Sequence, residues 1–192
     1  MEIEGGLTDE LASVVAGARR RALRDDDRQI DTAHLLHSLV ESDPEVRAVF
    51  DGPQVARLLG YLVQRSIGYG LRWQIGVEDA GVLPAAQGRS GWSPVAARAM
   101  TQAYDRAVLR GAGSAQGVDL LAVLVAATGS RAVEVLRKVG VDGEAVARRI
   151  AETDEGCVEG RVVSGDRGAE GVPGRRPAGR TGVIGDDAPV VG

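Results

Sequence analysis

The chain has 192 residues, a formal net charge of −4 and 23 basic residues, all but one of them arginine. This charge balance does not indicate the basic surface that is expected of a nucleic-acid-binding protein. No apolar run approaches the roughly 18 residues of a membrane-spanning helix, and the acidic N-terminus does not resemble a signal peptide. Cys157 is the only cysteine, which excludes an internal disulfide. We therefore expect a cytoplasmic protein with neither a nucleic-acid nor a membrane partner.

Four consecutive segments between about 7 and 65 carry apolar residues at helical spacing. Thr8 can cap the first predicted helix, and Asp31 or Thr32 can cap the second. Pro44 suits the first turn of a third, short helix because its missing N–H would have no partner there. The four predicted stripes contain Leu11, Val14, Val15, Ala18 and Ala22; Leu35, Leu36, Leu39 and Val40; Val46, Val49 and Phe50; and Val55, Leu58, Leu59, Leu62 and Val63.

The same order of stripe, break and cap recurs between about 92 and 150, beginning with Ser93-Pro94. Ala18 matches Ala103, and Leu35 matches Leu121 after a one-residue shift. A single unit of about 60 residues buries only a marginal core. We therefore expect an all-α fold in which two tandem four-helix repeats pack as one pseudo-twofold domain.

The predicted domain spans residues 1–151, with repeat 1 at about 7–65, a linker at 66–91 and repeat 2 at about 92–150. The linker is interpreted as a loop that partly packs on the body. From residue 152 to 192 glycine, proline and charged residues dominate, which predicts a disordered Gly/Pro/Arg-rich tail.

The sequence carries no recognisable catalytic, cofactor-binding or metal-binding constellation. His34 and His37 lie three residues apart, but no cysteine is near them, and Asp31 and Glu41 are ordinary helix-end carboxylates. A phosphate-binding loop needs a lysine after its glycine, whereas the single lysine, Lys138, lies in a predicted helix. We therefore predict no catalytic residue, no metal, no cofactor and no enzymatic activity.

The order of motifs within both repeats resembles the Clp N-terminal domain, the double-repeat helical module of Clp-type AAA+ unfoldases. The resemblance covers residues 7–150 and lacks the ATPase domains. The motifs that carry it are Leu7-Thr8-Asp9-Glu10 and Trp92-Ser93-Pro94; Ile30-Asp31-Thr32-Ala33-His34-Leu35-Leu36; Gln116-Gly117-Val118-Asp119-Leu120-Leu121; and Ala132-Val133-Glu134-Val135-Leu136 with Gly140-Val141-Asp142.

This resemblance implies a chaperone-associated protein-binding module that binds a Clp unfoldase, adaptors or protease substrates in regulated proteolysis. Without ATPase domains the chain is expected to be a stand-alone adaptor or decoy, or a fragment. Some relatives bind phosphorylated arginine through an acidic residue just before the His-Leu-Leu segment. The corresponding positions here are read as Ala33, which cannot pair with a guanidinium group, and Asp119, which is one methylene shorter than the usual Glu. The first site is therefore expected to be lost and the second altered. The candidate ligand-binding residues are Thr32, His34 and Asp119.

Simpler roles and other functions stay open. Thr32 and His34 can merely cap and pack the second predicted helix, and Asp119 can merely cap a helix. The run Arg19-Arg20-Arg21 permits a small helical transcriptional or partner-sensing regulator. An enzyme such as a peptidase is the third hypothesis, against which stands the missing pair of nucleophile and base.

Overall fold

The computed structural model describes residues 6–27, 29–67, 78 and 91–163, the last ten of them as backbone only. These ranges contain eight helices and no strand, apart from two isolated β-bridges. The predicted all-α fold of two packed four-helix repeats is confirmed. Linker residues such as Tyr69 and Trp73 lie outside the described residues.

The first copy consists of α1 (Asp9–Arg24), α2 (Thr32–Ser42), α3 (Pro44–Ala48) and α4 (Gly52–Ser66). The Thr8 hydroxyl accepts a hydrogen bond from the Leu11 N–H, as the sequence predicts. Asp31 rather than Thr32 is the N-cap of α2, and Asp43 caps α3 ahead of Pro44. Each cap satisfies backbone N–H groups that have no partner within the helix.

The second copy consists of α5 (Pro94–Leu109), α6 (Gly117–Ala126), α7 (Arg131–Lys138) and α8 (Gly143–Val163). Ser93 caps α5, Ser130 caps α7, and Gln116 and Asp119 form a reciprocal capping box on α6. The break and cap predicted at 140–142 are present, since Asp142 accepts a hydrogen bond from the Glu144 N–H at 3.0 Å.

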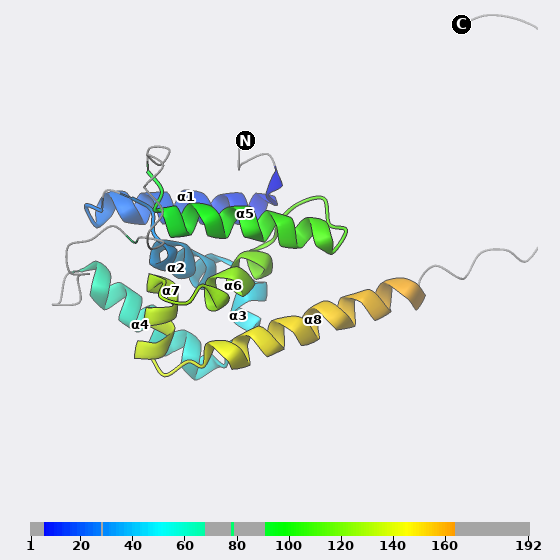
Figure 1. Ribbon diagram of the computed structural model, residues 1–192. Helices are drawn as coiled ribbons and strands as arrows, with labels where there is room; N and C mark the ends of the chain where they lie inside the picture. Colours follow the sequence, from blue (N-terminus) through cyan, green and yellow to red (C-terminus); the bar gives the residue numbers. More distant parts are fainter. Residues whose placement is uncertain (1–5, 28, 68–77, 79–90, 164–192) are drawn as a thin grey trace, which may run out of the picture.

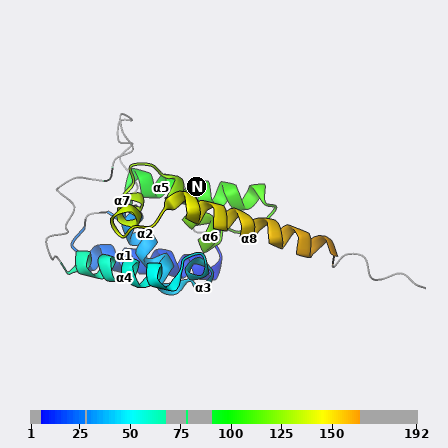
Figure 2. The same ribbon diagram turned by 90° about the horizontal axis from the view of Figure 1, so that it is seen from below.

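Helix α8 is longer than the sequence pattern predicts. The expected end lay near Ile150, with a tail from residue 152, but the helix continues to Val163. Residues 152–163 contain no proline, so each added residue can still form its backbone hydrogen bond. Figures 1 and 2 both show this end of α8 projecting beyond the other helices. The remainder of the predicted tail, 164–192, lies outside the described residues.

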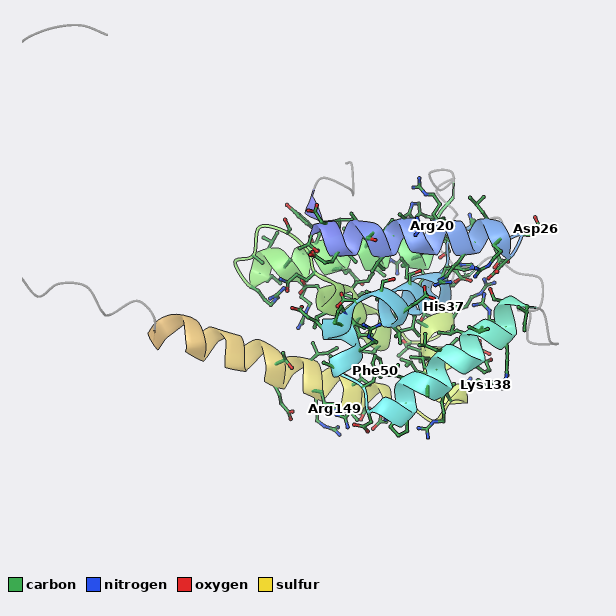
Figure 3. The ribbon with its side chains drawn as sticks, turned by 180° about the vertical axis from the view of Figure 1, so that it is seen from behind. Arg20, Asp26, His37, Phe50, Lys138 and Arg149 are labelled. Atoms are coloured by element: carbon green, nitrogen blue, oxygen red, sulfur yellow. The ribbon has the colours of Figure 1, made fainter. Side chains whose placement is uncertain are left out.

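One hydrophobic core joins the two copies. Helices α2 and α6 lie at its centre, each in contact with helices of both copies (Figure 1). Arg149 of α8 adds a polar link, since it donates to the Val49 carbonyl oxygen at 3.1 Å and lies 3.3 Å from an Asp51 carboxylate oxygen (Figure 3). The largest fully buried side chains come from both copies: Leu11, Leu35, Leu36, Leu39, Leu58, Leu62, Met100, Leu120, Leu121, Leu124, Leu136 and Ile150.

Two β-bridges reveal the pseudo-dyad and its register. Leu7 pairs with Ala115, and Ile30 pairs with Trp92. Adding 85 to Leu7 and Ile30 gives Trp92 and Ala115, so the dyad exchanges one bridge for the other. This offset matches Leu35 with Leu120, not with Leu121. The one-residue shift assumed from the sequence is therefore wrong, because the caps Asp31 and Gln116 fix the register without it.

No helix within the described part of the chain is long and apolar enough to cross a membrane.

Candidate functional site

A carboxylate from the linker sits at the meeting point of three helix starts. Glu78 is buried and accepts hydrogen bonds from the Thr32 N–H at 3.0 Å, the Ser93 hydroxyl at 2.8 Å and the Arg131 N–H at 2.7 Å. The Thr32 hydroxyl also donates to Glu78 and accepts from the Ala132 N–H at 3.0 Å. Thr32 is fully buried, so its side chain ties the linker to α2 and α7.

Asp31 lies beside this junction and is surrounded by cationic groups. Its carboxylate contacts the Arg131 guanidinium and lies 3.5 Å from that of Arg65. It also accepts from the His34 N–H at 2.8 Å, while the His34 imidazole Nδ1 lies 3.2 Å from the Asp31 N–H. Burial alone raises the pKa of Asp31, but His34, Arg65 and Arg131 outweigh it and hold that pKa well below its ordinary value.

The imidazole of His34 is 2 % exposed and faces carboxylates on both of its nitrogens. Its Nε2 atom lies 3.1 Å from Asp27 Oδ2 and 3.8 Å from Asp25 Oδ2. Burial lowers the pKa of His34, but the carboxylates of Asp27 and Asp31 outweigh this effect and raise it to about 9. Asp31 and Glu41 are the carboxylates near the histidines in sequence, whereas the fold also brings Asp25 and Asp27 to His34, which sequence spacing does not indicate.

Asp119, the third candidate, is also buried and already paired. The Arg110 guanidinium donates two hydrogen bonds to its carboxylate, at 3.0 Å and 2.6 Å. The Gln116 N–H donates a third at 2.9 Å, and Arg106 lies 3.4 Å away. This is the bidentate geometry in which a carboxylate binds arginine most strongly. An internal arginine therefore occupies the guanidinium-binding face of Asp119.

The dyad places His34 and Asp119 at equivalent positions, each the third residue of its helix. The position equivalent to Ala33 is accordingly Val118, which also carries no charge. The three candidate residues thus belong to two separate helix starts, with Thr32 and His34 on α2 and Asp119 on α6. Their role in ligand binding stays a prediction.

A groove of about 850 Å³ runs between α5 and α6 and ends at the turn 127–130. Its walls mix apolar and polar side chains, and Arg98 and Arg106 contribute positive charge. Leu109, at one end of α5, is 88 % exposed. The lining residues are Val95, Arg98, Ala99, Gln102, Asp105, Arg106, Leu109, Ala122, Val123, Ala126, Ala127, Thr128, Gly129 and Ser130.

The dyad-related surface between α1 and α2 carries larger polar residues instead. Buried Arg21 crosses it, donating to the Ser38 hydroxyl at 3.2 Å and forming an ion pair with Glu41. At the equivalent positions the second copy has Arg106, Val123 and Ala126, which offer no such acceptors. Arg106 turns toward Asp119 instead. Two residue differences, Ser38/Val123 and Glu41/Ala126, and the different direction of the equivalent arginine thus accompany the open groove in the second copy.

His37 shares the filled surface of the first copy and is 5 % exposed. Burial is the main cause that lowers its pKa to about 3, and Arg21, Arg24 and Arg65 add electrostatic repulsion. The imidazole is therefore neutral near pH 7. Ala122 is its counterpart in the groove of the second copy.

Comparison with solved structures identifies the fold as that of Clp N-terminal domains. The Hsp104 N-terminal domain from Candida albicans aligns with a TM-score of 0.60 at 11 % identity, covering 77 % of this chain and 91 % of that one. The N-terminal domain of the caseinolytic protease associated chaperone ClpD from Arabidopsis thaliana gives 0.57 at 16 %, covering 80 % and 96 %. A structure described as part of a malarial protein secretion system gives 0.56 at 16 %, covering 79 % and 96 %.

No protein-family model and no curated protein matches the chain. At 11–16 % identity the resemblance to these structures establishes the fold alone. The predicted double-repeat Clp N-terminal fold is confirmed.

Proposed function

We propose that this chain is a non-enzymatic protein-binding module that binds adaptors or substrates in Clp-dependent regulated proteolysis. The open groove between α5 and α6 carries this proposal, because it is a concave surface whose lining residues include no cysteine, histidine or lysine. The Clp N-terminal fold supports the same role, since the structures that share it include the N-terminal domain of a protease-associated chaperone.

The chemistry of the groove suits a peptide segment of a partner protein. Ala99, Ala122 and Val123 offer small apolar contacts, and Arg98 and Arg106 offer charge to a carboxylate. Protein interfaces typically combine apolar contacts with polar and charged ones. We expect a segment with apolar side chains and at least one acidic residue to bind there.

The groove can be tested by filling it. Ala126→Glu introduces the counterpart of Glu41, which pairs with Arg21 in the first copy, and brings a carboxylate into the groove that Arg106 also lines. Ala151→Glu is the matched control, because Ala151 is exposed on α8 and is not part of the groove. Both variants and the unaltered chain serve as bait for affinity capture with quantitative mass spectrometry.

We expect the unaltered chain and Ala151→Glu to capture Clp components, adaptors or protease substrates. The recovered amount of these proteins should be at least tenfold lower with Ala126→Glu. Recovery of none of these proteins by the unaltered chain would contradict the proposed function. Equal recovery by Ala126→Glu would show that the groove is not the binding surface.

The stand-alone role is a finer proposal: the chain acts as an adaptor or decoy for an unfoldase encoded elsewhere, in the cytoplasm. Adding the purified chain to a Clp unfoldase–protease reaction separates these roles. An adaptor raises the degradation rate of a labelled substrate, and a decoy lowers it. Unchanged degradation at saturating concentration would contradict both.

Recognition of phosphorylated arginine at Asp119 stays a prediction, and the structure shows what such binding would require. An external guanidinium must displace Arg110, whose two hydrogen bonds hold the carboxylate. Asp119→Ala should weaken binding of a phosphoarginine peptide, while Arg110→Ala should strengthen it by freeing the carboxylate. Isothermal titration calorimetry measures both, and unchanged affinity in both variants would remove Asp119 from the binding site.

The alternative of a DNA-binding regulator gains no support from the arginine run. Arg19 and Arg20 are exposed, but Arg21 is buried and pairs with Glu41. The three residues therefore do not form one basic surface. A gel-retardation measurement at two salt concentrations tests this alternative, because phosphate contacts weaken steeply with salt.

A further inference from the structure

Three potential metal ligands converge where the turn after α1 meets the start of α2. One carboxylate oxygen each from Asp25 and Asp27 and one imidazole nitrogen of His34 all lie within 4.8 Å of one another. Figure 3 labels Asp26, which stands between the two aspartates in this turn. Asp26 itself is exposed and has a φ of 56°, so its side chain is not part of the cluster.

On its buried side, this cluster contains a nitrogen atom that makes no hydrogen bond. His34 Nε2 is inaccessible to solvent and makes no hydrogen bond to any described residue, although two carboxylates lie beside it. Buried polar atoms rarely stay unsatisfied in folded proteins. A ligand between Nε2 and the two aspartates would satisfy it.

The other imidazole nitrogen, Nδ1, has two neighbours on Asp31: the backbone N–H, from which it accepts at 3.2 Å, and the carboxylate oxygen Oδ1. Nδ1 lies 2.9 Å from Asp31 Oδ1, so a proton on Nδ1 points at a carboxylate that is 1 % exposed. Metal binding requires the neutral imidazole, so the ion must displace the Nε2 proton that the raised pKa of His34 otherwise retains. In that form the Nδ1 proton replaces the 3.2 Å contact from the Asp31 N–H, and the Nε2 lone pair is directed at Asp25 and Asp27. A carboxylate behind the imidazole is the usual outer-shell partner of a histidine that binds metal.

We propose that Asp25, Asp27 and His34 bind a divalent transition-metal ion of the class of Zn²⁺. Imidazole and carboxylate donors together suit such ions. Bonds of about 2.0–2.1 Å in tetrahedral geometry place neighbouring ligand atoms about 3.3 Å apart. The observed separations of 3.1 Å and 3.8 Å from Nε2 to the aspartate oxygens bracket that value.

The surrounding groups leave these ligand atoms in place. Ser66 donates to Asp25 Oδ1 at 2.5 Å, which orients the opposite oxygen, Oδ2, toward His34. Arg65 lies 3.7 Å from Asp27 Oδ2, farther than His34 does. Its guanidinium is the cation with which a metal ion must share this oxygen.

The second copy shows why the site belongs to the first copy alone. The dyad-related positions of Asp25 and His34 hold Arg110 and Asp119, which form a closed ion pair at 2.6 Å. In the second copy the protein itself supplies the positive charge. In the first copy Asp25 and His34 are both potential metal ligands, and a metal ion would supply the positive charge.

The test is a titration of the full chain with Zn²⁺ by calorimetry and with Co²⁺ by visible absorption. Asp27→Asn removes the more exposed carboxylate ligand, and His34→Gln removes the nitrogen ligand. Asp26→Asn is the matched control, because it makes the same charge change one residue away, and asparagine tolerates the left-handed backbone there.

We expect one equivalent of metal to bind to the unaltered chain and to Asp26→Asn with equal affinity. Asp27→Asn and His34→Gln should each weaken binding at least tenfold. The Co²⁺ spectrum should lack a thiolate charge-transfer band, which separates this site from Cys157. Absence of saturable binding, or equal binding by Asp27→Asn and Asp26→Asn, would overturn the proposal and leave the cluster as an ion-pair network.

Discussion

Glu78 shows how much one side chain can organise. Its carboxylate accepts hydrogen bonds from groups at the starts of α2, α5 and α7, and so fixes three elements from both copies. No sequence pattern marks this residue, because its partners lie 15, 46 and 53 positions away. Caps within three residues of their helix, such as Thr8 and Ser93, could be predicted because both partners are local in sequence.

Replacing Glu78 should therefore destabilise the fold. Glu78→Ala leaves the Thr32 and Arg131 N–H groups without this acceptor, and we expect the free energy of unfolding to fall by about 2–4 kcal/mol. Urea denaturation measures it. Glu10→Ala, at an exposed position on α1, should change it by less than about 0.5 kcal/mol. Equal effects of the two changes would show that the Glu78 contacts add nothing.

His37 should make the fold sensitive to acid. Its pKa is about 3 in the folded state and 6.5 in a model peptide, so only the unfolded state gains a proton as the pH falls below 6.5. The stabilisation is complete above pH 6.5 and is lost toward pH 3. From pH 7 to pH 5 we expect the contribution of His37 to the free energy of unfolding to fall by about 2 kcal/mol.

His37→Gln removes this titration and should flatten the pH dependence of unfolding by that amount. Arg21 and Arg24 on α1, His34 on α2 and Arg65 on α4 are the charged groups that disfavour the imidazolium, and all remain in the variant. Parallel urea denaturation curves for both proteins at pH 7 and pH 5 measure the difference. An equal change in the free energy of unfolding between pH 7 and pH 5 in both proteins would contradict the role given to His37.

Among the elements, the helix stripes could be predicted but the groove could not. Leu35, Leu36 and Leu39 mark the buried face of α2 by spacing alone, and all are fully buried. The groove depends on which way Arg21 and Arg106 turn. That choice follows from their partners on a neighbouring helix, Ser38 and Glu41 in one copy and Asp119 in the other. Local spacing carries no information about such pairs.

The start of α6 packs closely against the first copy. A Cβ atom on Gly117 would lie 3.0 Å from Asp43 Cγ, at the cap of α3, and 3.2 Å from Leu39 Cδ2. Gly117→Ala should therefore force these elements apart, and we expect a loss of about 1–3 kcal/mol.

Gly113→Ala is the matched control for this contact. A Cβ atom at Gly113 meets nothing within 4 Å, so the change should be close to neutral. Thermal unfolding followed by circular dichroism compares the two variants. A Gly117→Ala protein as stable as Gly113→Ala would mean that α6 and α3 can separate without cost.

At the scale of the whole molecule, the repeat in the sequence predicts the architecture because each copy exposes an apolar face that only the other copy covers. The register, that is, which residue of the second copy is equivalent to which residue of the first, is less predictable from the sequence. Without a shift Leu35-Leu36 matches Leu120-Leu121, and with a one-residue shift Leu35 still matches Leu121, so a leucine match alone does not exclude the shift. The bridges Leu7–Ala115 and Ile30–Trp92 decide between these alternatives, and they connect residues distant in sequence.

Neither copy should fold alone. Residues 6–67 and 91–163, prepared as separate peptides, each lose the bridges and half of the shared core. A unit of about 60 residues has little stability to spare. We expect each peptide to show no cooperative thermal transition by circular dichroism, and an equimolar mixture to show one. Cooperative unfolding of either peptide by itself would contradict the shared core.

The exchanged bridges have a consequence for how such a chain can arise. Because each bridge takes one residue from each copy, two identical short chains could make both pairs by symmetric association. Fusion into one polypeptide removes the concentration dependence of that association. It also frees the halves to diverge. A homodimer must carry the same residues on both sides, whereas this tandem has acquired Asp25 and His34 on one side and Arg110 and Asp119 on the other.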